Sequence, residues 1–340
     1  MDILKIGIIG AGENTKKLHL PKLQSLPGIE IREVANRSLE SSNSVAEKFG
    51  IPVVRNSWQE VAQSPELDAI VIGTWPYLHC PATCMTLESG KHVLCEARMA
   101  MNQSEAEKML KTSERFPDLT AQLVPAPFSL HADSQIKEMI NNKEMGEVRH
   151  FQVNYLSPAS PGKELHWRRN KKYSGMNVMT LGIIYESLLR WLPPAKWVKA
   201  EARTFNSSAM ENGVAVPVEI PDYLSVQMSL ENNIPGVFLI SEASNYKETP
   251  QVKISGDKAT LILELVPDGK LWLVRNGKEN LVSISEKNKG RWKVEEEFIN
   301  SIRDRKPFTH TSFSTGLEYM KFTEAVYRSY KNNGTRVPVS

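Results

Sequence analysis

Residues 3–15 read ILKIGIIGAGENT, and this stretch decides the fold of the chain. Ile3 to Ile9 form a short apolar run typical of a buried strand, and Gly10 and Gly12 follow it directly. Glycines at this point let the backbone bend sharply and approach a pyrophosphate closely, while the amides of a following helix start supply partial positive charge. The stretch therefore predicts a dinucleotide-binding turn. The pair Asn14-Thr15 replaces the third glycine of the usual fingerprint, and so incomplete a match also fits a loop without a ligand.

The second strand of the pattern ends without the acidic residue that normally reads a ribose. Ile29 to Ala35 is the next apolar run, and Asn36, Arg37 and Ser38 follow it. A carboxylate there would accept hydrogen bonds from the ribose hydroxyls and repel a 2′-phosphate, whereas Asn, Arg and Ser offer that phosphate donors and a positive charge. The chain is therefore predicted to bind NADP in preference to NAD. The alternative is that Arg37 is an ordinary solvated charge.

Length and charge narrow the class of protein. A chain of 340 residues is long enough for two domains. Its formal net charge of +3 is small, and no tract of Lys and Arg with interleaved aromatic residues indicates a nucleic-acid partner. No apolar run approaches the ~20 residues of a membrane-spanning helix. We therefore expect a cytoplasmic protein with a small-molecule substrate and with neither nucleic acid nor membrane as a partner.

The three cysteines, Cys80, Cys84 and Cys95, form no Cys-x-x-Cys pair and cannot all be paired within the chain. Reduced thiols are the simpler interpretation. Cys80 and Cys84 lie one helical turn apart with His79 beside them, which raises the alternative of a metal site. A fourth ligand is not in sight and helical cysteine is usually a small core residue, so no metal is predicted.

Strands and helices alternate through the first third of the chain, as expected of βαβ units on a parallel sheet. Pro125-Ala126-Pro127 ends this pattern, and the later strands have a period of two, with a tight turn at Asn276-Gly277. We therefore predict an α/β fold in which residues 1–126 form a Rossmann domain with a doubly wound parallel sheet. Residues 127–340 are predicted to form an α+β domain with a large, mainly antiparallel open sheet, whose C-terminal helices can pack back on the first domain. One helix of this domain is expected at 177–192.

Two later segments are more specific than the glycine turn. Residues 68–76 read DAIVIGTWP and are followed by His79, and residues 89–96 read SGKHVLCE. Together they closely resemble the Gfo/Idh/MocA family, which is named for glucose-fructose oxidoreductase and inositol dehydrogenase. The likeness covers the whole chain. Further segments in family order are Trp167-Arg168, Ser174-Gly175, Gly182, Arg190-Trp191-Leu192 and Ile254-Ser255-Gly256.

The resemblance implies a Rossmann domain followed by an α/β domain whose open sheet lines the active site on one face and builds dimers on the other. Members bind NAD or NADP, and most move hydride between the nicotinamide and a sugar, polyol or related carbonyl compound. A homodimer or homotetramer formed through the open sheet face is therefore expected. Trp75 and His79 also fit plain core packing. The residues implied to contact the cofactor are Gly10, Gly12, Asn14, Thr15, Asn36, Arg37, Ser38, Thr74, Trp75, Pro76, His79, Glu96 and Ala97.

The departures from the family pattern concern chemistry rather than fold. In the family's Glu-Lys-Pro motif the lysine lies beside the nicotinamide and assists proton transfer, whereas here the motif reads Glu96-Ala97-Arg98. Members also carry Asp and His four residues apart on a helix of the second domain, and here those positions are Thr180 and Ile184. Neither acts as a general base near neutral pH. Acid–base help is worth roughly 10²- to 10⁴-fold in rate, so another group must supply it.

Tyr185 and Glu186 are two candidates for that group, because they follow directly on the same helix. A helix turns by about 100° per residue, so neither inherits the direction of Ile184. The alternative is that Tyr185 is a buried phenol and that Glu186 is a helix-end carboxylate paired with Arg190 at i+4.

His166 and Arg98 are the other two candidates. His166 belongs to the loop 163–169, which the resemblance implies overhangs the cleft, and imidazole titrates near neutral pH. A loop histidine is more often a surface residue. Arg98 stays protonated and would orient or polarise an anion or carbonyl rather than take a proton. Tyr77 and Tyr155 are weaker candidates. The residues expected to face the substrate are Trp167, Arg168, Asn177 and Thr180.

Three functional hypotheses follow. The first is an NADP-dependent oxidoreductase acting on a sugar-like or other small carbonyl or alcohol compound, with a non-standard proton-transfer group. The second is a non-redox enzyme that holds its dinucleotide tightly and cleaves glycosidic bonds through transient oxidation. The third is a catalytically inactive regulatory protein that keeps the fold and the dinucleotide. Reduction of a conjugated or imine bond, as in the related biliverdin reductases, has little support in this sequence.

Overall fold

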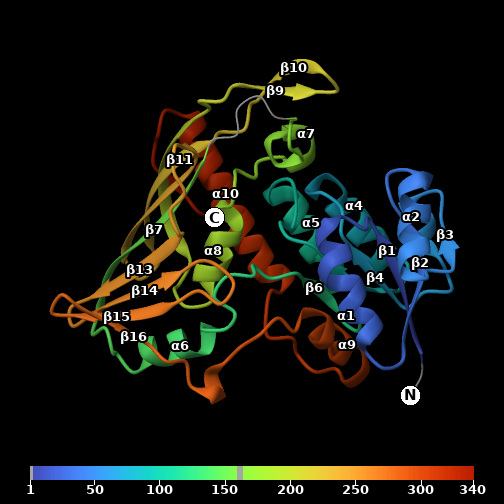
Figure 1. The fold of residues 1–340 in the computed structure, drawn as a ribbon, viewed down its shortest axis with the longest axis horizontal. Coiled ribbons are helices and arrows are strands. Elements are labelled where there is room, and N and C mark those ends of the chain that lie inside the picture. Colours follow the sequence, from blue (N-terminus) through green and yellow to red (C-terminus); the bar gives the residue numbers. More distant parts are fainter. Residues whose placement is uncertain (1–2, 159–163) are drawn as a thin grey trace. The chain divides into compact units, whose positions relative to one another are not determined.

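Two units divide the chain in the computed structural model, which describes residues 3–158 and 164–340 (Figure 1). The first unit combines Met1–Pro125 with Lys293–Leu317, and the second combines Ala126–Trp292 with Glu318–Ser340. The chain thus returns to the first unit for one short segment near its C-terminus. Lys163, which opens the loop singled out above, lies outside the described residues.

The first unit is built on a six-stranded sheet in the order β3-β2-β1-β4-β5-β6, in which every neighbouring pair is parallel. Ile8 and Ile70 on its central strands are fully buried, as a sheet covered on both faces requires. The strand order reverses between β1 and β4, and in such sheets ligands bind beyond the carboxyl ends of the strands at this point. The predicted Rossmann sheet is confirmed. Its strands are β1 (Leu4–Ile9), β2 (Ile29–Ala35), β3 (Val53–Val54), β4 (Ala69–Ile72), β5 (His92–Cys95) and β6 (Ala121–Leu123).

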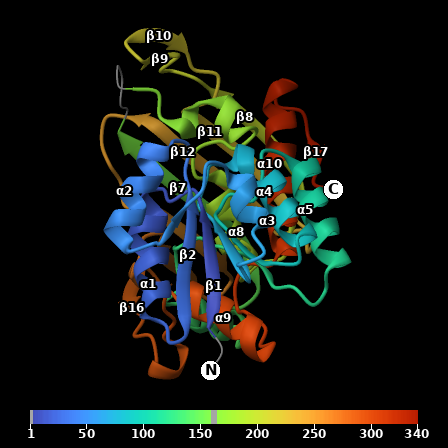
Figure 2. The ribbon, with the colours of Figure 1, turned by 90° about the vertical axis from the view of Figure 1, so that its right-hand side faces the viewer.

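Helices cover both faces of this sheet, with α1 and α2 on one side of the strands and α3, α4 and α5 on the other (Figure 2). Ser38, Ser57 and Asn102 begin three of them, because each side-chain oxygen accepts a hydrogen bond from a main-chain amide of the first turn. The elements are the π-helical turn η1 (Thr15–His19), α1 (Leu20–Ser25), α2 (Leu39–Phe49), α3 (Trp58–Gln63), α4 (Pro76–Glu88), α5 (Gln103–Arg115) and α9 (Val294–Asp304).

The second unit is built on a nine-stranded sheet in the order β16-β15-β14-β13-β7-β12-β11-β8-β17. Of its described pairs, β7 with β12 is parallel and the others are antiparallel. Val252 and Ile254 are fully buried while Lys253 between them is not, so alternation gives the sheet one packed face. The predicted open sheet is confirmed. Its strands are β7 (Val148–Pro158), β8 (Ala195–Arg203), β11 (Tyr223–Leu230), β12 (Pro235–Ser244), β13 (Gln251–Gly256), β14 (Thr260–Glu264), β15 (Leu271–Arg275), β16 (Lys278–Leu281) and β17 (Val337–Pro338).

Helices α6 and α8 lie on one face of this sheet together with α10, which begins in the first unit and continues in the second (Figure 1). The packing is aromatic in part, since the ring centroid of Phe238 on β12 lies 6.0 Å from that of Phe322 on α10. The remaining elements are α6 (Asp133–Asn141), η2 (Trp167–Arg169), α7 (Lys171–Ser174), α8 (Leu181–Leu189), β9 (Ser208–Glu211), β10 (Val214–Pro217), η3 (Glu286–Asn288) and α10 (Phe313–Lys331).

The helix predicted at 177–192 is shorter than expected, because α8 spans Leu181–Leu189. Met179 has a φ of 44°, which breaks the helical path before Thr180. The tight turn predicted at Asn276-Gly277 is confirmed. Its two residues have φ values of 50° and 76°, and a primed turn joining β15 to β16 needs positive values at both.

Within the described ranges, no helix is long and apolar enough to cross a membrane. The same residues contain no group of three or more His, Cys, Asp or Glu side chains placed to hold a metal ion. Cys80, Cys84 and Cys95 are all free and buried. The hydroxyl of Thr112 on α5 lies 3.4 Å from the Cys84 sulfur, so this thiol belongs to the packing of α4 on α5.

Candidate functional site

A cavity of about 450 Å³ opens in the first unit at the carboxyl ends of β1, β2 and β4. The strand order places a ligand site at this edge of the sheet. The predicted cofactor residues that line it are Gly10, Gly12, Asn36, Arg37, Thr74 and Trp75. Tyr77, a weaker candidate for proton transfer, lines it as well. Further lining residues that were not predicted are Ser41, Asn56, Ser57, Trp58 and Leu78.

The glycine turn packs tightly against the segment that follows β4. Gly10 has a φ of 82°, and a Cβ there would lie 2.4 Å from Thr74 Cγ2 and 2.9 Å from the Thr74 amide nitrogen. A Cβ on Gly73 would lie 2.4 Å from the Gly10 carbonyl oxygen. Both positions therefore require glycine, for backbone conformation at Gly10 and for space at both.

Asn36 holds the glycine turn from the side. Its Oδ1 accepts a hydrogen bond of 2.6 Å from the Ala11 amide, and its Nδ2 donates to the main-chain oxygen and the hydroxyl of Ser41. Ser38 caps α2 by accepting from the Ser41 amide. Both side chains are predicted to face the ribose. Asn36 lines the cavity and Ser38 does not, and both form these hydrogen bonds within the protein. Arg37 remains at the cavity, with its guanidinium 5.5 Å from the centroid of the Trp75 ring.

Thr74 lines the cavity and has a hydroxyl that is not used in hydrogen bonding among the described residues. Its Oγ1 is buried and has no hydrogen-bond partner in the part of the chain that the structure describes. Buried polar groups are nearly always paired, so a hydroxyl of this kind at a cavity wall suits a bound ligand. Together with the crowded glycines, it shows a cradle whose residues fit a dinucleotide.

Pro76 and His79 lie behind this wall and do not line the cavity. Pro76 is the first residue of α4, where its missing amide costs nothing. The His79 ring is fully buried, with Nδ1 2.8 Å from the Arg98 carbonyl oxygen and Nε2 3.0 Å from that of Thr74. Burial lowers its pKa, so the ring is neutral near pH 7 and one of the two nitrogens donates. His79 thus braces the two segments rather than facing the cavity.

Glu96 is held in a buried cluster at the end of β5. Its Oε1 accepts from Asn14 Nδ2 and lies 3.0 Å from His19 Nε2, and its Oε2 accepts a 3.1 Å bond from the Ala97 amide. His19 Nδ1 in turn lies 2.6 Å from Oε1 of Glu295 on α9. Asn14, Glu96 and Ala97 are predicted cofactor residues, whereas His19 and Glu295 carry no signal in the sequence that predicts a place in this cluster.

The two carboxylates decide the charge of His19. Burial would lower the pKa of this ring, but the hydrogen bonds and charges of Glu295 and Glu96 outweigh burial and raise the pKa to about 9. Burial would likewise raise the pKa of Glu96, and the contacts from His19, Asn14 and Ala97 bring it below its usual value. At neutral pH the cluster therefore contains one imidazolium between two carboxylates.

Thr15 and Arg98 complete the predicted residues of the first unit. Thr15 is buried, and its hydroxyl donates to the Gly10 carbonyl oxygen at 3.4 Å, so that it supports the glycine turn from within. The Arg98 side chain is 3% exposed, and its carbonyl oxygen contacts His79. The family's lysine position is thus held by Ala97, and the buried cation Arg98 follows it.

In the second unit, Tyr185 is part of the core. The side chain is 1% exposed, its hydroxyl oxygen accepts a 2.7 Å hydrogen bond from the Ala195 amide, and its ring stacks on Phe322 with centroids 3.7 Å apart. Burial raises the pKa of this phenol well above its usual value. These contacts match the buried phenol weighed above as the alternative to a catalytic role.

Glu186 belongs to a buried ion network on α8. Arg190 Nη2 donates to Glu186 Oε2 at 2.6 Å, and Arg190 Nη1 donates to Asp133 Oδ2 on α6 at 2.9 Å. Glu186 Oε2 also accepts from the Ala126 amide at 3.0 Å. Burial would lower the pKa of Arg190, but its two carboxylate partners raise it. The expected i+4 pairing is present, and it leaves the Glu186 carboxylate fully engaged.

Thr180 and Asn177 lie just before α8. Thr180 Oγ1 is buried and makes no hydrogen bond with any residue in the described ranges. Asn177 is 1% exposed, and its Nδ2 donates to the Ser174 carbonyl oxygen at 2.7 Å. Of these two predicted substrate residues, Thr180 has a hydroxyl that is not used in hydrogen bonding within the described ranges. Asn177 stabilises the turn before α8 through its hydrogen bond to Ser174.

At η2, His166 and Arg168 are exposed and Trp167 between them is half-buried. The Arg168 guanidinium lies 4.4 Å from the centroid of the Trp167 ring. His166 Nδ1 accepts from the Arg168 amide at 3.3 Å, which places the proton of the neutral ring on Nε2. Arg168 also affects Tyr155 on β7. Burial and the charge of Glu242 raise the pKa of Tyr155, and the charge of Arg168 partly offsets this rise.

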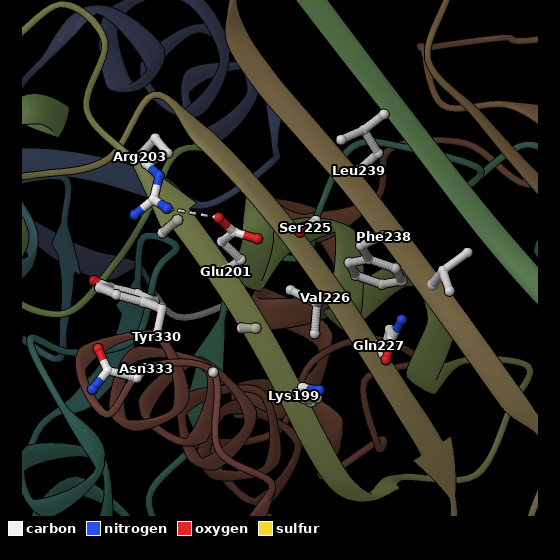
Figure 3. A pocket seen from close by; sticks show the side chains of 14 residues that line it. Lys199, Glu201, Arg203, Ser225, Val226, Gln227, Phe238, Leu239, Tyr330 and Asn333 are labelled. Carbon is white, nitrogen blue, oxygen red and sulfur yellow. Dashed lines mark ion pairs between the residues drawn. The ribbon is translucent and has the colours of Figure 1, made fainter.

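A larger hollow of about 770 Å³ lies along β8, β11 and β12 and the end of α10 (Figure 3). Lys199, Glu201 and Arg203 line it from β8, and Glu201 pairs with Arg203 at 2.9 Å. Both of these side chains are mostly exposed. The hollow contains none of the predicted site residues.

Two protein-family models together match most of the chain. The model of an oxidoreductase family with an NAD-binding Rossmann fold, GFO/IDH/MocA, matches residues 4–119. The model of the GFO/IDH/MocA C-terminal domain matches residues 134–262. The two matches fall one in each unit, in the order predicted from the sequence.

Individual relatives are distant. Trans-1,2-dihydrobenzene-1,2-diol dehydrogenase of Mus musculus is 27% identical over 286 residues, which are 81% of this chain and 78% of that protein. D-glucoside 3-dehydrogenase of Escherichia coli is 28% identical over 145 residues, covering 43% of this chain and 41% of that protein. Among solved structures, levoglucosan dehydrogenase in complex with NADH and L-sorbose matches the whole of both chains with a TM-score of 0.85 at 18% identity.

Proposed function

The chain belongs to the GFO/IDH/MocA oxidoreductase family, and from this premise we propose that it is an NADP-dependent oxidoreductase. Its substrate would be a sugar-like or other small carbonyl or alcohol compound. The observation that carries the proposal is the cradle where Gly10 and Gly73 leave no room for a Cβ and Thr74 presents an unpaired buried hydroxyl. The bound nicotinamide would supply the hydride donor or acceptor. The names of the sugar and diol dehydrogenases among the relatives support the substrate class.

We base the preference for NADP on Arg37. Asn36 and Ser38 form hydrogen bonds within the protein. Arg37 is the cation among the described residues that line the cavity, and its guanidinium lies near the Trp75 ring. A guanidinium there would form charge-assisted hydrogen bonds with a 2′-phosphate. Neither carboxylate of the cluster at Glu96 lines this cavity.

Arg37→Ala should therefore weaken NADPH binding by about 10- to 100-fold, the range that loss of a charged hydrogen bond of about 1.5–3 kcal/mol implies. NADH binding should change by less than about threefold, since NADH lacks the 2′-phosphate. The measurement is a fluorescence titration with each reduced cofactor. Arg115→Ala is a matched control, because Arg115 also lies over a neighbouring aromatic ring, 5.4 Å from the centroid of Phe116, but is remote from the cavity lining. Equal loss of NADH and NADPH affinity in Arg37→Ala would refute a role in cofactor choice.

For proton transfer we propose His166. Tyr185 and Glu186 are engaged in the core of the second unit, whereas His166 is exposed and carries an imidazole, a side chain that can act as a general acid or base. Reduction of a carbonyl needs a proton for the oxygen that gains charge as hydride arrives, and an imidazolium can give it. In the reverse direction the neutral ring can accept the hydroxyl proton. We propose that Arg98 polarises the reacting oxygen, and that Trp167, Arg168, Asn177 and Thr180 contact the substrate.

Turnover of a panel of sugars, keto-sugars and cyclic polyols with NADPH or NADP tests this proposal. His166→Gln should lower turnover by roughly 10²- to 10⁴-fold, the usual range for a lost acid–base group. His150→Gln, at another exposed histidine of the same unit, should leave turnover unchanged. Tyr185→Phe and Glu186→Gln should lower stability but not the turnover of the folded fraction. Loss of turnover in Glu186→Gln with unchanged stability would contradict the assignment.

One observation favours a second candidate, a dinucleotide-binding protein without catalysis. Two of the four predicted proton-transfer residues are engaged elsewhere: the Tyr185 ring packs on Phe322, and the Glu186 carboxylate pairs with Arg190. Binding of NADPH without turnover of any substrate in the panel would move the conclusion to this candidate. Protein that purifies with nicotinamide dinucleotide already bound, and forms product without net change in its redox state, would instead indicate a glycoside-cleaving enzyme.

The cytoplasmic location and a homodimer or homotetramer remain proposals. Self-association through the open sheet is supported by apolar side chains that its strands leave exposed, such as Val237 at 46% and Leu281 at 62%. The mass of the protein in solution tests it.

A further inference from the structure

The buried cluster of His19, Glu96 and Glu295 joins three segments of the first unit that are far apart in the sequence. His19 ends the π-helical turn η1, Glu96 follows β5, and Glu295 lies in the first turn of α9. The His19 side chain is 0% exposed, that of Glu295 2% and that of Glu96 13%. Charged groups are rarely buried so deeply unless they are paired, and here one cation serves two anions.

The π-helical turn explains how His19 reaches both carboxylates. A π-helix closes its hydrogen bonds between residues five apart, one more than in an α-helix, and is frequent at functional sites. Here the turn brings both Thr15 and His19 to the buried side, while Lys16 and Lys17 between them stay exposed. Thr15 then bonds to the Gly10 carbonyl oxygen and His19 to the cluster, so η1 is fixed at both ends.

The cluster adjoins the groups expected to hold the dinucleotide. Asn14, the residue before η1, donates to Glu96. The Lys16 amide donates to the Gly12 carbonyl oxygen at 3.0 Å, so η1 continues directly from the glycine turn. The amides at the start of such a turn attract the negative pyrophosphate. A contact that holds η1 in place therefore also holds the anion-binding end of the site in place.

We propose that His19 and Glu295 are positioning residues for the dinucleotide, and that the affinity of this chain for it depends on the proton held by His19. This inference rests on the proposed function. With His19 protonated, the three side chains carry a net charge of −1. Loss of the proton makes it −2 and leaves a neutral ring with a single N–H, so only one of the two carboxylates keeps its hydrogen bond from His19. This loosens the hold on η1 and adds negative charge close to an anionic ligand. Affinity should therefore fall as the proton is lost.

Among the described residues, the charged groups whose hydrogen bonds and charges raise the His19 pKa to about 9 are Glu295 on α9 and Glu96 at the end of β5. Lys16 and Lys17 on its own turn are exposed and lie outside the cluster. Because the pKa in the folded protein is raised, the ring is protonated below about pH 8 and neutral above about pH 10. The second ionisation of a phosphate group, near pH 6, lies outside this window.

The test is the dissociation constant of NADPH between pH 7.5 and 10.5, measured by fluorescence titration. In the wild type it should stay constant to about pH 8.5 and then rise by about tenfold or more around a midpoint near 9. Glu295→Gln removes a carboxylate that raises the His19 pKa, so its midpoint should move down by at least one pH unit. His19→Gln should bind with the weak alkaline affinity at every pH.

Glu33→Gln is the matched control. Glu33 is also a buried carboxylate of the first unit, held by Arg55 and Ser64 and not lining the cavity, so its loss should leave the midpoint unchanged. A wild-type affinity that does not change with pH would overturn the inference, and this measurement needs no variant to fold. So would a midpoint that Glu295→Gln leaves in place. Failure of the wild type to bind NADPH at any pH would instead overturn the proposed function.

Discussion

Gly10→Ala should weaken NADPH binding by at least about 100-fold, which corresponds to ~2.7 kcal/mol. Alanine at a φ of 82° is strained, and its Cβ would lie 2.4 Å from Thr74 Cγ2 and 2.9 Å from the Thr74 amide nitrogen. The second of these atoms belongs to the backbone and cannot turn away. Relief therefore has to come from displacement of the glycine turn or of the segment after β4, and both line the cavity. Fluorescence titration with NADPH measures the loss.

Gly50→Ala separates backbone strain from the effect on the site. Gly50 ends α2 with a φ of 66°, and a Cβ there would meet no atom within 4 Å. This variant should lose some stability because alanine is strained at positive φ, yet it should bind NADPH as the wild type does. NADPH binding by Gly10→Ala within threefold of the wild-type affinity would contradict the placement of the dinucleotide at this turn.

Arg190→Met should lower the free energy of unfolding by about 3–5 kcal/mol, the cost of breaking a buried ion pair from one side. The Arg190 side chain is 6% exposed, and its partners Glu186 and Asp133 are 3% and 4% exposed. Methionine fills much of the same space but leaves two carboxylates buried without a cation. The deficit should shrink at pH 5, where the stranded carboxylates can take up protons. Urea unfolding followed by tryptophan fluorescence measures this, since Trp191 donates to Asp133 and lies in the network.

Arg203→Met is the matched control for that prediction. Arg203 also pairs with a glutamate, Glu201 at 2.9 Å, but these side chains are 64% and 61% exposed. Pairs at the surface contribute little, so the free energy of unfolding should change by about 0.5 kcal/mol or less. Similar losses in the two variants would show that burial does not set the value of the Arg190 network.

The fold could be predicted from the sequence because its signals are local. The apolar run before Gly10 and the period of two around Val252 and Ile254 each follow from which faces of a strand are buried. The turn at Asn276-Gly277 needed only the backbone freedom of its two residues. The short α8 was missed because Met179 adopts a positive φ that no local preference of methionine indicates.

The candidate site was harder to predict, because side-chain direction and long-range pairing decide it. Asn36 and Ser38 were placed correctly at the end of β2, yet their polar atoms bond within the protein. His19 looked like one residue of an ordinary helix, and nothing near it in the sequence indicates a partner 276 positions away. The spacing of four residues predicts that Glu186 pairs with Arg190. Nothing in the sequence indicates that Asp133, the third residue of this ion network, pairs with Arg190 as well.

Because Lys293–Leu317 belongs to the first unit, that unit cannot be completed until this late segment has been synthesised. The parallel sheet is synthesised first, but its edge strand β6 bonds to residues near the end of the chain, since the Leu123 amide donates to the Thr311 carbonyl oxygen. At roughly 5–20 residues per second, a ribosome needs roughly 10–40 s to deliver that segment after β6 has emerged. During this delay the edge of the sheet is uncovered and His19 lacks Glu295. A nascent chain therefore exposes an open strand edge until Lys293–Leu317 has been synthesised, and that interval is when a chaperone would be of most use to it.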